Sequence, residues 1–118
     1  MPRAEDLLFS ATRWVIVATG TNAIVTASRA GVAGRHNFIV AISLSASGQP
    51  ATPVTAQVRA NSGGTILDQL EIPAAAFAPI VINYVRPLEV TVSQQCDVNL
   101  PALGSGITGT VTLRGFTA

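Results

Sequence analysis

The stretch that decides the fold runs from His36 to Ser47 and reads HNFIVAISLSAS. Alternate positions along it are mostly apolar, which is typical of a β-strand with one face in a core. The residues of this expected face are His36, Phe38, Val40, Ile42, Leu44 and Ala46. At about 3.3 Å per residue, such a strand would span the height of a small β domain. We therefore expect the shorter strands to be organised around it.

Seven shorter segments also have the length and composition of strands. They are residues 14–18, 23–27, 54–60, 65–72, 80–85, 88–93 and 107–116. The first, WVIVA, is continuously apolar, as in a strand covered on both faces. Asn61-Ser62-Gly63-Gly64 is the best hairpin turn, and Pro73 and Pro79 leave room for at most one helical turn between them. We predict an all-β fold, a single-domain antiparallel β-sandwich, jelly-roll-like, with about eight strands.

The N-terminal segment differs from the rest. We expect residues 1–13 to form an arm or a short helix and residues 14–118 to form the β-sandwich domain. Leu7, Leu8 and Phe9 make a small apolar group after the acids Glu5 and Asp6. Such an arm often reaches a neighbouring subunit, although a frayed terminus is an equal alternative. The acids argue against a secretory signal, and no apolar run is long enough for a membrane helix.

Charge is sparse: 11% of the residues are charged, against about 25% in an ordinary soluble protein. A weakly charged surface loses little solvation when another chain covers it, which favours an assembly subunit over a free monomer. A neutral β surface without a partner is the alternative. The seven cations are all arginines, scattered along the chain, and this disfavours nucleic-acid binding. Arginine suits protein interfaces, although a GC-rich genome would also explain the missing lysine.

Candidates for chemistry are few. His36 is the only histidine and Cys96 the only cysteine, so no metal site or disulfide is expected. Cys96 falls in a predicted loop, residues 94–106, and has no nearby cation to activate its thiol. Asp68 and Glu71 fall on opposite faces of a strand and cannot act as a carboxylate pair. The sequence predicts no catalytic residue and no cofactor.

Several segments in order resemble the small β-sandwich virion proteins of tailed bacteriophages, the capsid decoration or cement protein type. They are the glycine loop at residues 30–34, Arg35-His36, the long strand, Asn61–Gly64, residues 86–90 and residues 106–117. The resemblance is one of pattern and covers most of the chain from Trp14 onward. It implies a homo-oligomer, often a homotrimer, that binds the major capsid protein on the outside of a virion. It implies no catalytic residue.

The function predicted from this resemblance is that of a structural decoration protein that stabilises the capsid, with no nucleic-acid or membrane partner. The alternative is a tail-fibre or head-fibre module that binds a receptor or a carbohydrate. Aromatic residues are few for a sugar platform, although one exposed Trp would reopen that question. The interface candidates are Leu7, Leu8 and Phe9 as apolar anchors, with Arg3, Arg35 and Arg86 as cations.

Overall fold

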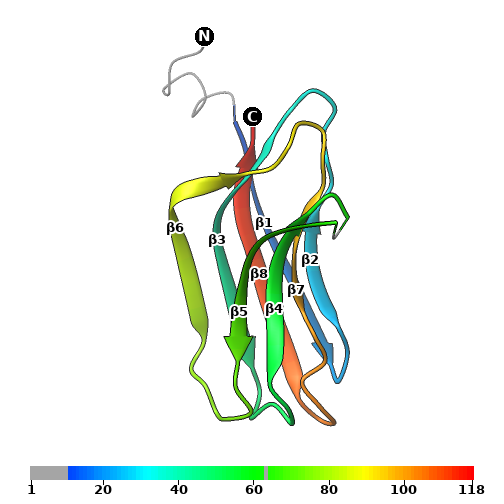
Figure 1. Cartoon of the computed structure of the whole chain (residues 1–118), viewed down its shortest axis with the longest axis vertical. Coiled ribbons are helices and arrows are strands. Elements are labelled where there is room, and N and C mark those ends of the chain that lie inside the picture. Colours follow the sequence, from blue (N-terminus) through cyan, green and yellow to red (C-terminus); the bar gives the residue numbers. More distant parts are fainter. Residues whose placement is uncertain (1–10, 63) are drawn as a thin grey trace.

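A computed structural model of the chain describes residues 11–62 and 64–118, and in these residues all regular structure is β (Figure 1). The strands are β1 (Thr12–Thr21), β2 (Val25–Arg29), β3 (Asn37–Ala46), β4 (Val54–Ala60), β5 (Thr65–Ile72), β6 (Ile80–Glu89), β7 (Cys96–Leu100) and β8 (Thr108–Thr117). The predicted number of strands is confirmed. Because β1 begins at Thr12, residues 12 and 13 belong to the sandwich rather than to the expected arm. No helix in the described residues is long and apolar enough to cross a membrane.

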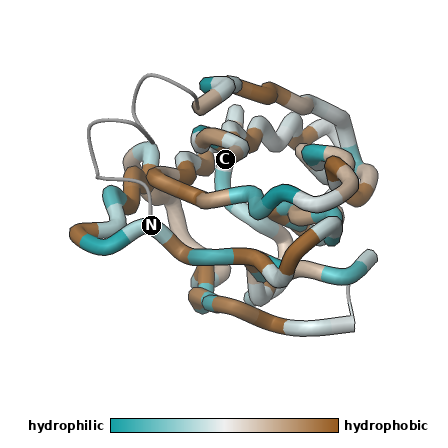
Figure 2. The backbone as a smooth tube through the Cα atoms, turned by 90° about the horizontal axis from the view of Figure 1, so that it is seen from above, coloured by the Kyte–Doolittle hydropathy of each residue, from teal (hydrophilic) through white to brown (hydrophobic). Residues whose placement is uncertain are grey.

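The strands form two antiparallel sheets of four. Sheet 1 has the order β1-β8-β3-β6, and sheet 2 has the order β2-β7-β4-β5. Consecutive strands mostly alternate between the sheets, which is the connectivity of an eight-stranded jelly roll. Figure 2 views the two layers from above, with hydrophobic and hydrophilic residues following one another along the chain. The predicted fold class is confirmed.

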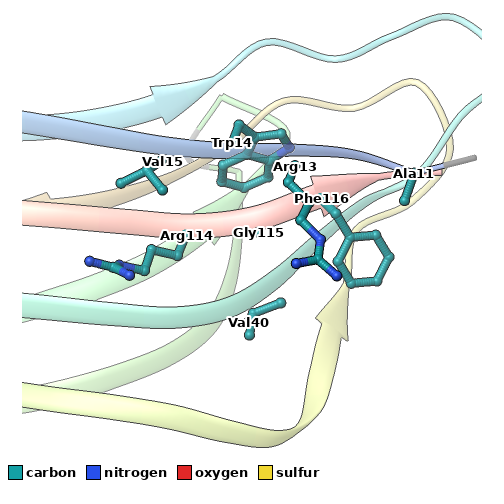
Figure 3. Close-up of a pocket in the computed structure, with 8 residues that line it drawn as sticks. All are labelled: Ala11, Arg13, Trp14, Val15, Val40, Arg114, Gly115 and Phe116. Atoms are coloured by element: carbon teal, nitrogen blue, oxygen red, sulfur yellow. The ribbon is translucent and has the colours of Figure 1, made fainter. Parts of the chain in front are cut away.

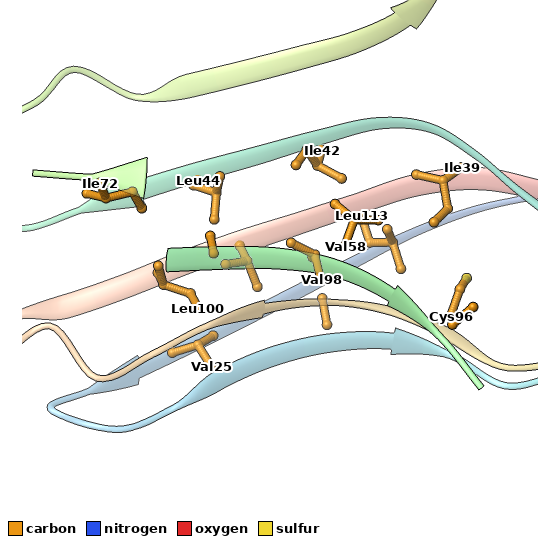
Figure 4. Close-up of a cluster of buried hydrophobic side chains, with 14 of the residues drawn as sticks. Val25, Ile39, Ile42, Leu44, Val58, Ile72, Cys96, Val98, Leu100 and Leu113 are labelled. Atoms are coloured by element: carbon orange, nitrogen blue, oxygen red, sulfur yellow. The ribbon is translucent and has the colours of Figure 1, made fainter. Parts of the chain in front are cut away.

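The core lies between the two sheets (Figure 4). Sheet 1 contributes Ile39, Ile42 and Leu44 from β3 together with Val111 and Leu113 from β8. Facing them, sheet 2 contributes Val58, Ile72, Val98 and Leu100, all at most 1% exposed. Each such side chain contributes about 1.5–3 kcal/mol when fully buried. The long strand β3 is therefore central to the core, as its sequence predicts.

The predicted apolar face of β3 is only half right. Ile39 pairs with Gly115 of β8, but the next paired residue is Ala41, opposite Arg114, so Val40 is an extra residue in a β-bulge. Since a bulge shifts the side-chain alternation by one position, Ile42 and Leu44 enter the core while Phe38 and Val40 do not. Ile39 takes the inner position in their place.

Strand β6 also departs from the prediction. We expected one strand to end before Arg86-Pro87 and another to begin at Leu88. Instead, β6 continues through Arg86 and Pro87 to Glu89. On β3 only Val40 lies between the partners of Asn83 and Leu88, so four residues of β6 bulge out of the ladder. Pro87 is tolerated there because β6 is an edge strand with no further neighbour.

Cys96 was placed in a loop by the sequence, and that placement is wrong. It opens β7, pairs with Arg29 of β2 and Ala60 of β4, and is 0% exposed. The strand was missed because CDVNL contains Asp97 and Asn99 and is only five residues long. Cys96 is a core residue.

Candidate functional site

The outer face of sheet 1 is an apolar and weakly charged surface. Strand pairing and alternation place these side chains on it: Arg13, Val15, Val17, Thr19 and Thr21 of β1; Thr108, Thr110, Thr112, Arg114 and Phe116 of β8; Phe38, Val40, Ala41, Ser43 and Ser45 of β3; Val81 and Asn83 of β6. We call this surface the valine–threonine face. Its charged members are Arg13 and Arg114, with Glu89 at one end beside Phe38.

Valines form the apolar part of this face. Val15 and Val17 on β1 and Val81 on β6 keep 59%, 62% and 61% of their surface exposed. One row crosses all four strands, because Val17 pairs with Thr112, Thr112 with Ser43 and Ser43 with Val81. Exposed apolar side chains that share one weakly charged sheet face mark a candidate docking surface. The sequence missed it because the apolar run at residues 14–18 was interpreted as covered on both faces.

Threonines form the polar part, and their hydroxyls largely satisfy one another. The hydroxyl oxygens of Thr21 and Thr108 lie 2.7 Å apart, and those of Thr19 and Thr110 lie 3.3 Å apart. Thr19 also donates to the carbonyl oxygen of Gly109 at 3.1 Å. Because these polar groups already have partners in the protein, covering them with another chain costs less solvation free energy than covering charges.

A hollow of about 460 Å³ opens at one end of the face (Figure 3). Val15, Val40 and Phe116 give it apolar walls, and Arg13 and Arg114 bring two guanidinium groups to it. Phe116 is held by stacking on Phe38, with ring centroids 4.8 Å apart and planes 13° from parallel. The bulge in β3 is what turns Val40 outward toward this hollow. A second hollow, which shares Arg114 with the first, lies over Ser43, Val81 and Asn83.

The outer face of sheet 2 is different in character. Arg59 there makes a two-pronged ion pair with the buried carboxylate of Asp97, with Nε 2.9 Å from Oδ1 and Nη2 3.2 Å from Oδ2. Gln95 donates a further hydrogen bond to Asp97 at 3.1 Å, and Glu71 accepts one from Thr55 at 2.7 Å. These charged groups are already committed within the fold. The valine–threonine face is therefore the better candidate for docking.

The predicted interface cations are not brought together. Arg35 is exposed in the connection between β2 and β3, and Arg86 is exposed in the bulged part of β6. Neither lies among the residues that line the hollow. Arg3, Leu7, Leu8 and Phe9 lie outside the described residues. The arginines on the face are Arg13 and Arg114, which no sequence motif distinguishes from the others.

The side chains that could carry out chemistry, His36 and Cys96, have structural roles. Nδ1 of His36 lies 2.8 Å from the carbonyl oxygen of Val90 and 3.4 Å from a carboxylate oxygen of Glu89. Burial raises the pKa of the Cys96 thiol to about 12, so it is protonated at neutral pH and unreactive. Among the described residues, no three His, Cys, Asp or Glu side chains cluster as metal ligands.

The two carboxylates singled out in the sequence lie on opposite faces, as predicted. Glu71 faces outward and accepts a hydrogen bond from Thr55. Asp68 pairs with the inward-facing Val58 and accepts a hydrogen bond from the Tyr84 hydroxyl at 2.9 Å, which ties β5 to β6 across the sandwich. Burial, followed by this bond, raises the pKa of Tyr84 above its usual range. The pair is structural.

Trp14, the residue that an exposed sugar platform would have required, is buried. It is 8% exposed, its Nε1 donates to the Thr117 hydroxyl at 3.0 Å, and the Arg29 guanidinium lies 5.7 Å from its ring centroid. Its indole face is therefore committed within the fold. Phe38 and Phe116 are the aromatic side chains that remain partly accessible on the valine–threonine face.

No protein-family model matches the chain, and no curated protein matches it. Two solved structures are similar to it in overall shape. One is the CBM36-1 domain of a multidomain xylanase from the hindgut metagenome of Trinervitermes trinervoides, with 9% identity, a TM-score of 0.45, and coverage of 89% of this chain and 96% of that one. The other is the carbohydrate-binding module CBM36 in complex with calcium and xylotriose, with 13% identity, a TM-score of 0.39, and coverage of 86% and 76%. The likeness to phage virion proteins stays a prediction.

Proposed function

We propose that this chain is a non-catalytic assembly module that docks on a protein surface through the valine–threonine face, as a decoration protein on the outside of a phage capsid. The observation that supports the proposal is the exposure of Val15, Val17 and Val81 on a sheet face with almost no charge. Covering such a face with a second apolar surface removes it from water, which lowers the free energy of the complex.

The magnitudes favour an oligomer that binds at several points. Covering the exposed parts of Val15, Val17 and Val81 would contribute about 1–2 kcal/mol for each side chain. Association of two proteins costs about 4–15 kcal/mol in lost translational and rotational freedom alone. One such face is therefore a weak binder, whereas linked copies on a lattice of identical sites multiply their affinity through effective concentration. A homotrimer on a capsid would meet that condition.

The test mixes the purified protein with undecorated capsids of its own phage and counts bound copies. The intact chain is expected to coat the capsids in high copy number and to raise their resistance to heat. Val17→Asp places a charge on the β1 side of the face and is expected to abolish coating. Ile66→Asp, at an exposed apolar residue on the outer side of sheet 2, is the matched control and should coat normally. Equal coating by both variants would contradict the proposal.

A second candidate is a carbohydrate-binding module on a phage fibre, and the hollow is the observation that favours it. Its volume of about 460 Å³ accommodates a sugar ring, with the Phe116 ring available for stacking and Arg13 and Arg114 available for hydrogen bonds to hydroxyl or carboxylate groups. Titration calorimetry with neutral xylo-oligosaccharides and with an oligomer of a uronic acid tests it. Binding that is lost in Phe116→Ala, by a protein that ignores capsids, would replace the decoration proposal.

A further inference from the structure

The hollow lies where the N-terminal segment joins the sandwich. Ala11 is the first residue that the structure describes, and its side chain lines the hollow together with Val15, Val40 and Phe116 (Figure 3). Ten further residues precede Ala11 in the chain. At up to about 3.5 Å per residue, those ten residues can reach about 35 Å from the rim of the hollow. That reach lets the segment extend beyond its own copy.

The sequence of these ten residues, MPRAEDLLFS, complements the hollow in both polarity and charge. Leu7, Leu8 and Phe9 offer apolar side chains to its apolar walls. Glu5 and Asp6 come directly before them, which puts two carboxylates within a few residues of the apolar group. The guanidinium groups of Arg13 and Arg114 provide the matching cations at the hollow.

We propose that the segment Glu5–Phe9 of one copy docks in the hollow of a second copy, so that copies of this chain are joined by exchanged arms. A copy's own segment is less suited, because Phe9 stands only two residues before Ala11 and the chain would have to reverse at Ser10 to enter a hollow that Ala11 itself lines. Each copy then gives one arm and accepts one, which closes a ring when the rotation between copies is a simple fraction of a turn.

The inference rests on the proposed function in one respect: the exchanged arms would create the linked copies that a weak docking face needs. It assigns the arm to the contact between copies and leaves the rest of the valine–threonine face for the capsid. Loss of the arm contact should therefore lower self-association first, and lower capsid binding only through the loss of linked copies.

Disulfide trapping tests the contact directly. Leu8→Cys protein is mixed with Val40→Cys protein and treated with a mild oxidant; Cys96 stays in both because it is 0% exposed. The expected product is a covalent heterodimer of about 24 kDa, twice the chain mass of 12.1 kDa. The control mixture of Leu8→Cys with Ile66→Cys, on the other sheet, should give little of it. No heterodimer, or an equal yield from the control, would overturn the inference.

A single chain that carries both Leu8→Cys and Val40→Cys separates exchange from folding back. Exchange predicts covalently linked oligomers after oxidation, whereas a 12.1 kDa product with an internal disulfide at low concentration would overturn the second-copy assignment. Charge reversal gives an independent check: Arg114→Glu should weaken self-association, and Asp6→Arg in the same chain should restore it in part. Absence of any effect of Arg114→Glu would remove the electrostatic part of the argument.

The two proposals fail in different ways. Leu8→Asp is expected to weaken self-association about 10- to 100-fold, the range that corresponds to one buried leucine. If Leu8→Asp leaves the oligomer intact while Val17→Asp destroys both the oligomer and capsid binding, the arm inference is wrong and the docking face stands. If both variants assemble and coat capsids normally, both proposals are wrong.

Discussion

Replacing Thr117 with Val should destabilise the sandwich more than its small change in shape suggests. The Thr117 hydroxyl accepts a hydrogen bond from Trp14 Nε1 at 3.0 Å and donates one to Asn37 Oδ1 at 2.6 Å. Thr117 is 2% exposed, and Asn37 and Trp14 are also buried. The valine has nearly the same volume but leaves the indole N–H and the amide oxygen without this partner in a region with little access to water.

The expected cost follows from these two groups. Each buried polar group left without a partner costs about 1–3 kcal/mol, so Thr117→Val should lower the free energy of unfolding by about 2–6 kcal/mol. Domains of this size have about 5–15 kcal/mol in total, so the loss would be large. Asn37 keeps its other bonds, from Nδ2 to the carbonyl oxygens of Ala30 and Gln94, both at 3.2 Å, which limits the damage to the side facing Thr117.

Urea unfolding followed by Trp14 fluorescence measures this effect, because Trp14 is the only tryptophan and lies in the network. Protein concentration must be equal for all variants, since assembly adds stability. Thr117→Ser is the control: it keeps the hydroxyl, removes one methyl group and should cost about 1 kcal/mol. A Thr117→Val protein within 1 kcal/mol of the control would refute the reasoning from buried hydrogen bonds.

Three further changes test the fold. Cys96→Ser should cost about 1–3 kcal/mol because it buries a hydroxyl in an apolar core, and the native thiol should not react with a maleimide at neutral pH; rapid labelling of the folded protein would show that the strand is misplaced. Gly115→Ala should prevent folding or cost several kcal/mol, since a Cβ would lie 2.6 Å from Trp14 Cη2, whereas Gly48→Ala, with no atom within 4 Å of its Cβ, should be neutral by thermal melting. The free energy of unfolding should fall as the pH rises from about 9 toward 12. The pKa values of Cys96 and Tyr84 are both raised in the folded state, so the unfolded chain loses these protons first. A melting temperature that does not change with pH over this range would contradict the burial of these two groups.

The sequence predicted the fold class because turns and alternation agree over most of the chain. The predicted hairpin pairing of β4 with β5 is present, and Asn61 and Ser62 after β4 adopt positive φ values of 56° and 54°, as a tight turn between two strands requires. The C-terminal strand, Thr108–Thr117, also has the predicted threonine-lined outer face. These features are local, and local patterns are what a single sequence records.

What the sequence did not predict depends on non-local pairing. The bulge at Val40 reverses the alternation of β3, and nothing within HNFIVAISLSAS marks the extra residue. A second bulge, opposite Val58 and Arg59, adds Leu67 to β5 and accounts for the irregular alternation seen there in the sequence. Both depend on the neighbouring strand, which the stretch itself does not contain.

The candidate site was predictable only in part. Sparse charge indicated a surface that is easily covered, but it did not indicate which sheet would carry that surface. Val15 and Val17 belong to the first apolar run, and whether such a run is covered on one face or two depends on whether a second layer packs outside it. Arg114 and Phe116 join them through the pairing of β1 with β8, almost a hundred residues away in the chain.

Light scattering coupled to size exclusion, at micromolar protein and physiological salt, tests most directly the claim that the chain assembles through the valine–threonine face. The account predicts that the intact chain has a mass that is a multiple of 12.1 kDa, that Ile66→Asp keeps it, and that Val15→Asp, which places a charge in the hollow on this face, reduces it to 12.1 kDa with its fold preserved by circular dichroism. An intact chain that elutes as a 12.1 kDa monomer, or a Val15→Asp variant as large as the intact protein, would contradict it.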